Sequence, residues 1–168
     1  MNKCVFLDRD GVLNVDNVNY TWTTEAFIIL PGVAEALKIL KDKGYKLVII
    51  TNQSGIAKGV YKDEDVMNCH RYLQEKTGHL IDEIYYSPYH HTKTESLGTK
   101  PGTLNFEKAI AKFDIDPNQS FMVGDTERDL IPAKKIGLKT FLIPHRTPES
   151  AFADITVDSL LEACNYIP

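Results

Sequence analysis

Cysteine is scarce in this chain of 168 residues, and the three present are far apart. Cys4, Cys69 and Cys164 form no C-x-x-C pair, so the sequence indicates neither a disulfide framework nor a cysteine-based metal site. We expect all three to lie in the core as small apolar side chains.

Long apolar runs and clusters of basic residues are also missing. No segment approaches the roughly 20 apolar residues of a membrane-spanning helix, and the apolar stretch after Lys3 is too short for a secretory signal. The formal net charge is −4, without Lys/Arg clusters, which argues against binding to nucleic acid or to an anionic membrane surface. We therefore expect a cytoplasmic monomer whose partner is a small molecule.

Short apolar runs alternate with helical patterns along the whole chain. The runs predict strands at residues 3–7, 45–50, 84–87, 121–123 and 140–143, with a last short strand near Ile155. The helical patterns cover residues 31–43, 63–77, 104–113 and 130–136, and residues 152–167 are expected to hold the last short strand followed by a terminal helix. This alternation predicts an α/β fold with a doubly wound, Rossmann-like parallel sheet, in one domain over residues 1–168.

Two carboxylates follow the first predicted strand directly. Asp8 and Asp10 would lie on the same side of an extended chain, and Gly11 lets the backbone turn away after them. Two like charges this close indicate a divalent cation or a shared proton, although a solvated turn would also use Asp and Gly. Ligands of open parallel sheets bind beyond such strand ends, so this is a candidate active site.

Three further segments have polar residues suited to phosphate or to a metal, two of them directly behind a predicted strand. They are TNQSG at 51–55, KPG at 100–102 and GDTERD at 124–129. Each taken alone is compatible with an ordinary loop or helix cap. Together with Asp8 and Asp10 they place hydroxyl, amide, ammonium and carboxylate groups at one edge of the predicted sheet.

In this order the four segments resemble the signature of the haloacid dehalogenase-like phosphohydrolases, with a core that lacks a cap domain. DRDGVLN at 8–14, TNQSGIA at 51–57 and GDTERD at 124–129 are similar to the branch that acts on D-glycero-D-manno-heptose 1,7-bisphosphate and on histidinol phosphate. The resemblance runs from about residue 3 to residue 144. It implies a phosphatase, with the 7-phosphate of the heptose bisphosphate as the leading target and histidinol phosphate as the alternative.

The resemblance also implies catalytic roles for four residues. Asp8 would attack phosphorus and form an aspartyl-phosphate, while Asp10 would protonate the leaving alkoxide and later activate water. Thr51 and Lys100 would hold the phosphoryl oxygens, and Lys100 would also offset the charge of Asp8.

A Mg²⁺ ion is the cofactor that the resemblance implies. Its protein ligands would be the carboxylates of Asp8 and Asp125 and the backbone carbonyl of Asp10, while Asp129 would orient a metal-bound water. Many relatives in this branch also carry a zinc loop with three cysteines, but residues 87–101 contain none. We therefore do not expect zinc. His90 and His91 in this stretch are either a solvent-facing pair or donors to the substrate.

Substrate recognition is expected to rest on loops, because the segments after the first two motifs are too short for a cap. The Arg that precedes the Lys in the family is replaced by Thr99, so the group it contacts would be held differently here. The expected substrate-binding side chains are polar: Asp16, Asn19, Asn52, Gln53, Ser54, Thr99 and Thr126.

Two non-enzymatic interpretations of the sequence compete with that of a phosphatase. A phospho-accepting signalling domain also combines an acidic cluster, a hydroxyl and a Lys, but its phosphorylated Asp lies near the middle of the chain. Here Asp8 is on the first strand, and Asp10 is placed to hydrolyse the adduct. A degenerate relative that only binds its ligand would lack a catalytic position, and none is missing.

Overall fold

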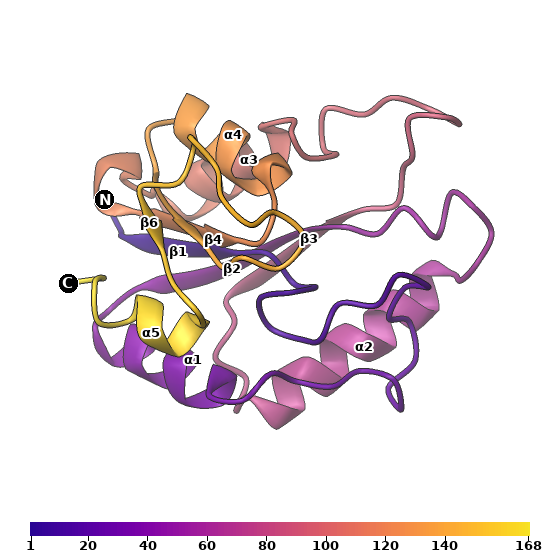
Figure 1. The fold of residues 1–168 in the computed structure, drawn as a ribbon, viewed down its shortest axis with the longest axis horizontal. Coiled ribbons are helices and arrows are strands. Elements are labelled where there is room, and N and C mark those ends of the chain that lie inside the picture. The colour runs from indigo at the N-terminus through magenta and orange to yellow at the C-terminus, as the bar shows by residue number, and fades with distance from the viewer.

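The computed structural model describes residues 1–168 and contains six strands and five α-helices (Figure 1). The strands are β1 (Cys4–Leu7), β2 (Lys46–Asn52), β3 (Glu83–Ser87), β4 (Phe121–Gly124), β5 (Lys139–Leu142) and β6 (Ile155–Thr156). The helices are α1 (Val33–Asp42), α2 (Asp63–Lys76), α3 (Leu104–Phe113), α4 (Glu127–Lys135) and α5 (Leu160–Ala163). A 3-10 turn, which the sequence did not predict, covers Pro117–Gln119.

All six strands are parallel and form one sheet in the order β3-β2-β1-β4-β5-β6. The chain runs outward from β1 to β3, returns to place β4 beside β1, and then runs outward in the other direction. The strand order therefore reverses between β1 and β4, the position where such sheets bind ligands. The predicted doubly wound α/β fold is confirmed.

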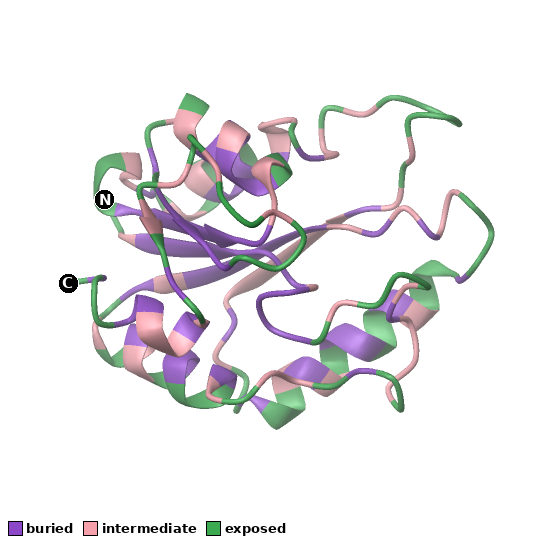
Figure 2. Cartoon of the chain, in the orientation of Figure 1, coloured by how far each residue is buried: buried purple, intermediate pink, exposed green.

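Helices cover both faces of the sheet, and each face has its own apolar core (Figures 1 and 2). Side chains of α1, α2 and α5 pack on one face, and those of α3 and α4 on the other. Successive residues of β1 alternate between them: Val5 and Leu7 join the first core, Cys4 and Phe6 the second. Burial on both faces explains why the strands read as continuous apolar runs.

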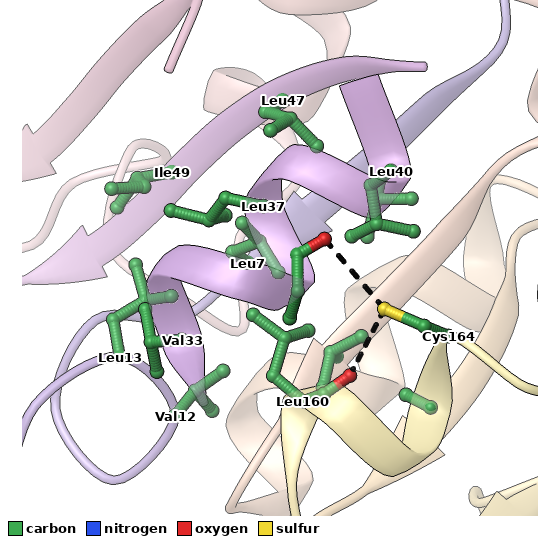
Figure 3. Packing of buried hydrophobic residues seen from close by; sticks show 14 of the residues in the cluster. Leu7, Val12, Leu13, Val33, Leu37, Leu40, Leu47, Ile49, Leu160 and Cys164 are labelled. Atoms are coloured by element: carbon green, nitrogen blue, oxygen red, sulfur yellow. Dashed lines mark hydrogen bonds between the residues drawn. The ribbon is translucent and has the colours of Figure 1, made fainter. Parts of the chain in front are cut away.

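The three cysteines are buried and unpaired, as expected from the sequence. Cys164 packs in the first core, where its Sγ lies within hydrogen-bonding distance of two backbone oxygens, those of Leu160 and Ala36 (Figure 3). It behaves as a small apolar side chain with a weak donor.

Helix α4 begins three residues earlier than the apolar pattern predicted, at Glu127 instead of Leu130. The reason is a capping box: the side chain of Asp129 accepts from the backbone N–H of Thr126, which stands at the N-cap. Asp129 is therefore part of the helix. Strand β2 likewise extends two residues further than predicted, so that Thr51 lies within the strand.

No helix or strand is inserted between β1 and α1 or between β2 and α2, the segments where a cap would lie. The segments that follow β1 and β2 at this edge are loops, which agrees with the expectation of a core without a cap. None of the helices has the length and apolar character needed to cross a bilayer.

His70 of α2 gives the fold a predicted pH dependence. Burial, with the charge of Arg9, lowers the pKa of His70 from 6.5 to about 3, so the folded protein keeps this ring neutral. Below pH 6.5 the unfolded chain binds a proton at His70 that the folded chain does not. The free energy of unfolding therefore falls as the pH is lowered from 6.5 toward 3.

We expect His70→Leu to reduce the fall in the free energy of unfolding between pH 7.5 and pH 5, measured by urea denaturation, relative to the unsubstituted protein. His79→Asn changes an exposed histidine and should leave that fall unchanged. An equal fall in all three proteins would contradict this account.

Candidate active site

The four motifs meet in one cavity of about 1040 Å³ at the carboxyl ends of the strands. Most of the site residues expected from the sequence line it: Asp8, Asp10, Asp16, Thr51, Asn52, Gln53, Ser54, Thr99, Lys100, Asp125, Thr126 and Asp129. Asn19 does not line the cavity; it is exposed, and its backbone N–H donates to the side chain of Asn17. Only four of the 28 residues that line the cavity are hydrophobic, so the cavity suits a polar ligand.

Lys100 joins the motifs at the centre of the site. Its Nζ donates to Asp8 Oδ1 at 2.8 Å, to Asp129 Oδ1 at 2.5 Å and to the backbone oxygen of Ile50 at 2.6 Å. The ammonium is almost fully buried. Burial would lower the pKa of Lys100, but the charges of Asp129 and Asp8 outweigh it and raise the pKa, so the group stays charged.

Three carboxylates, those of Asp8, Asp125 and Asp129, offer oxygens within 4.8 Å of one another. Burial and the charge of Asp129 raise the pKa of Asp8, and burial and the charge of Asp8 raise the pKa of Asp125. Lys100 is the single cation that forms ion pairs with this cluster, so when all three carboxylates are ionised two negative charges remain uncompensated. Oxygen donors with this excess charge fit a hard divalent cation such as Mg²⁺.

Glycine is required beside the carboxylates. A Cβ at Gly11, where φ is +90°, would lie 2.4 Å from Asp125 Oδ2, so any other residue would displace that carboxylate. A Cβ at Gly124 would lie 2.3 Å from Asp129 Cβ. The bare backbone at these two positions lets the end of β1, the end of β4 and the first turn of α4 bring the three acids together.

The carboxylate of Asp10 is held by four hydrogen bonds. Arg9 donates to Oδ2 through Nε at 3.1 Å and to Oδ1 through Nη2 at 3.0 Å, Asn14 donates to Oδ1 at 2.9 Å, and Gln53 donates to Oδ2 at 3.0 Å. Burial would raise the pKa of Asp10, but the charge of Arg9 and these hydrogen bonds outweigh it and lower the pKa. These four contacts fix the position of the Asp10 carboxyl group beside Asp8.

Three of the expected substrate-binding residues, Asn52, Gln53 and Thr126, have side chains whose polar groups bind the protein itself. Gln53 contacts Asp10, Thr51 and Tyr61. The Asn52 amide donates to the Lys100 backbone oxygen at 3.0 Å and accepts from the Lys100 N–H at 2.9 Å, so it ties the loop of Lys100 to β2. The Thr126 hydroxyl donates to Asp129 Oδ2 at 3.0 Å. The contacts of Asn52 and Thr126 position the charged groups of Lys100 and Asp129.

The rim combines neutral and charged side chains. Thr99 Oγ1 lies 2.5 Å from Ser87 Oγ, a pairing of two hydroxyls where the family has an Arg. Asp16 forms an ion pair with Arg146, which lies in the loop after β5.

His90 and His91 both line the cavity, with their ring centroids 4.2 Å apart. Neither belongs to a group of three potential metal ligands.

Sequence reasoning gave no role to several residues that contact or line the site. Arg9 and Asn14 stand within the quoted DRDGVLN segment, and both bind Asp10. Lys58, Arg128 and Arg146 line the cavity from three different loops or helix ends. The signal for Arg9 was available, because a charged residue between two motif carboxylates must find a partner when it is buried.

A nucleophile, a neighbouring proton carrier, an oriented hydroxyl and a cation site converge here. Asp8 can attack phosphorus, and Thr51, Lys100 and a bound cation can stabilise the negative charge on the phosphoryl oxygens. This combination is that of phosphoryl transfer to a carboxylate.

Comparisons with known proteins agree with this geometry. A family model described as haloacid dehalogenase-like hydrolase matches residues 14–143. A protein from Haemophilus ducreyi named D-glycero-beta-D-manno-heptose-1,7-bisphosphate 7-phosphatase is 38% identical, over 98% of both chains. A protein of the same name from Pasteurella multocida is 38% identical over 99% of this chain and 91% of its own.

Solved structures share the fold. A D,D-heptose 1,7-bisphosphate phosphatase from B. bronchiseptica, complexed with magnesium and phosphate, superposes with a TM-score of 0.89 at 23% identity, covering 98% of this chain and 97% of its own. A phosphatase-like protein from Mesorhizobium loti gives a TM-score of 0.85 at 24% identity, covering 99% and 87%. The resemblance drawn from the four motifs is confirmed.

The close approach of Gly11 to Asp125 leads to a prediction about cation binding. Gly11→Ala should push the Asp125 carboxylate away, so millimolar MgCl₂ should raise the Tm of this variant less than that of the unsubstituted protein. Gly59→Ala is the matched control, because Gly59 also has a positive φ but no atom within 4 Å of an added Cβ. Both variants should lose about 1–2 kcal/mol of stability from backbone strain. An unchanged Mg²⁺ response in Gly11→Ala would contradict the prediction.

Proposed function

The chain belongs to the haloacid dehalogenase-like hydrolase family and is a phosphatase, and we propose that it removes the 7-phosphate of D-glycero-β-D-manno-heptose 1,7-bisphosphate with Mg²⁺ as cofactor. The proposal is carried by the named relatives, which match nearly the whole chain at 34–38% identity. The convergence of all four motifs in one polar cavity supports it. A non-enzymatic signalling domain is no longer a competing interpretation.

The reaction follows from the positions of the two motif carboxylates. An oxygen of Asp8 attacks phosphorus, the bond from phosphorus to the sugar oxygen breaks, and the leaving alkoxide takes a proton from Asp10, which enters this step in its protonated form. The negative charge of the phosphoryl group bound beside Asp10 opposes its ionised form and so favours uptake of that proton. Water then attacks the aspartyl-phosphate and passes a proton to Asp10, and the bond to Asp8 breaks to release phosphate. Lys100, already 2.8 Å from Asp8, offsets charge next to the reacting group.

Mg²⁺ would be held by Asp8 and Asp125, with the Asp10 backbone carbonyl as a third protein ligand. When bound, the ion supplies charge neutralisation for the phosphoryl group. Asp129 is less available, because Lys100 and the Thr126 cap already occupy both of its oxygens. It would orient a water instead of binding the ion.

Histidinol phosphate remains the second candidate substrate. Its cationic groups would need an acidic or aromatic partner on the rim. Asp16 is such an acid, but it is paired with Arg146, and the cavity contains the further cations Lys58 and Arg128. This balance of charge favours a substrate with a second anionic group.

The phosphate that is not hydrolysed would be bound by Lys58 and Arg128. Both line the cavity, and neither forms an ion pair within the protein. Lys58 Nζ is held at 2.7 Å by the neutral hydroxyl of Tyr20, which leaves its charge free for a ligand. These side chains would take over the task of the family Arg that Thr99 replaces.

We also propose that a single domain performs this reaction as a cytoplasmic monomer without zinc. All groups named above come from the edge of one sheet in one chain. Phosphorylated sugars do not cross a bilayer unaided, which favours the cytoplasm.

The substrate is tested by phosphate release from the heptose 1,7-bisphosphate, histidinol phosphate and other sugar phosphates, with Mg²⁺ or with EDTA. We expect the bisphosphate to exceed histidinol phosphate about tenfold or more in kcat/KM, and EDTA to abolish turnover. Asp8→Asn should remove activity, and Asp10→Asn should lower kcat by ~10²-fold. A preference for histidinol phosphate, or turnover by Asp8→Asn, would overturn the proposal.

Binding of the second phosphate is tested with Lys58→Met. This variant should raise KM about tenfold for the heptose 1,7-bisphosphate, because a charge contact to the distal phosphate is lost, and leave KM for the heptose 7-phosphate nearly unchanged. Lys93→Met removes an exposed charge in the nearby loop outside the cavity lining and serves as the control. Equal effects on both substrates would place the second phosphate elsewhere.

A further inference from the structure

One side-chain amide links two groups of the proposed reaction. Gln53 Nε2 donates to Asp10 Oδ2 at 3.0 Å and to Thr51 Oγ1 at 3.0 Å. An amide nitrogen carries two protons, so both are used in these contacts. Gln53 is 2% exposed, and its amide therefore has a single environment between β1 and β2.

The contact with Gln53 decides which way the Thr51 hydroxyl can donate. Thr51 Oγ1 accepts from the amide, and no group of the protein accepts the hydroxyl proton. That proton is consequently free for an oxygen in the cavity that Thr51 lines.

The hydrogen bond from Gln53 to Asp10 comes from a different segment of the chain than the other three hydrogen bonds to this carboxylate. Arg9 and Asn14 belong to the same segment as Asp10 and would move with it. Gln53 directly follows β2, the strand that supplies Thr51. It is therefore the hydrogen bond that fixes Asp10 relative to the phosphoryl-binding strand.

The orientation of the Gln53 amide is set from behind by Tyr61. The Tyr61 hydroxyl donates to Gln53 Oε1 at 2.8 Å, which directs Nε2 toward Asp10 and Thr51. A half-turn of the amide would point Oε1 at the Asp10 carboxylate and would break all three hydrogen bonds.

The ring of Tyr61 is held firmly in place. It is 4% exposed, it stacks on Trp22 with centroids 6.3 Å apart, and it meets the edge of Tyr20 at 5.7 Å. A Cβ at Gly55 would lie 2.1 Å from a ring carbon, so the ring occupies space that only glycine leaves open. Tyr61 does not line the cavity.

We propose that Tyr61 is a positioning residue: it orients the Gln53 amide, which in turn places the Asp10 carboxyl for proton transfer to the leaving group. The proposal rests on the proposed role of Asp10 as the proton donor. It does not depend on which sugar carries the phosphate.

This role predicts a dependence on the leaving group. A sugar alkoxide needs a proton as the bond to phosphorus breaks, whereas p-nitrophenolate leaves without one. Because kcat/KM reports only the steps through the first irreversible one, it isolates this proton transfer from the later hydrolysis of the aspartyl-phosphate.

The test compares Tyr61→Phe with the unsubstituted enzyme on two substrates: the sugar phosphate with the highest kcat/KM in the panel above, and p-nitrophenyl phosphate. Tyr61→Phe keeps the ring and removes the hydroxyl. We expect kcat/KM to fall roughly tenfold or more on the sugar phosphate and less than about threefold on the aryl phosphate. Tyr45→Phe is the matched control, because Tyr45 is also buried and its hydroxyl donates to the Pro168 backbone oxygen at 3.0 Å, away from the cavity.

A double-substitution cycle shows whether Tyr61 acts through Gln53. Gln53→Met keeps the length of the side chain without the amide, and it should itself slow the sugar phosphate more than the aryl phosphate. In that background Tyr61→Phe should cause no further loss, whereas a merely structural effect would reduce kcat/KM by the same factor in both backgrounds.

Two results would overturn the proposal: equal losses on both substrates with Tyr61→Phe, or fully additive losses in the cycle. Both results are kcat/KM comparisons, and both require an unsubstituted enzyme that turns over the sugar phosphate. Failure of the proposed function is distinguishable from either, because it would show as absence of sugar phosphate turnover in the unsubstituted enzyme.

Discussion

The buried ammonium of Lys100 is the interaction on which the site depends. It joins three segments at once: Asp8 after β1, the Ile50 oxygen in β2 and Asp129 in α4. An unpaired carboxylate in this setting would carry a large desolvation cost, so the acids can be brought together only with a cation between them. Two hydrogen bonds with the Asn52 side chain hold the backbone of Lys100 in place, so the end of β2 also positions this ammonium.

The sequence predicted the location of the site because a parallel sheet brings all carboxyl strand ends to one edge. Polar residues behind apolar runs were therefore enough to place Asp8, Thr51 and Asp125 together. The partners of individual side chains were not predictable in this way. Asn52 and Thr126 read as substrate ligands, but the first binds the Lys100 backbone and the second caps α4 through Asp129, and such choices depend on distances across the fold.

The start of a helix can likewise be predicted where its cause is local in the sequence, whereas a contact between distant residues cannot. The apolar period placed α4 at Leu130, whereas the capping box starts the helix at Glu127 and so draws Asp129 into its first turn. That pattern of Thr and Asp was visible in the sequence and outweighed the apolar period. The contact of Gly11 with Asp125 was not visible, because it joins residues more than a hundred positions apart.

Chemistry and selectivity are supported by different parts of the molecule. The reacting groups stand on strand ends, where packing on both faces of the sheet restricts their movement. The cations available for a second anionic group, Lys58 and Arg128, stand on a loop and at a helix start and are exposed. A change in these two residues alters charge at the rim without disturbing Lys100 or its partners. A fold of this kind can therefore keep its reaction while its substrate changes, which is why the substrate must be argued from the rim and the reaction from the sheet.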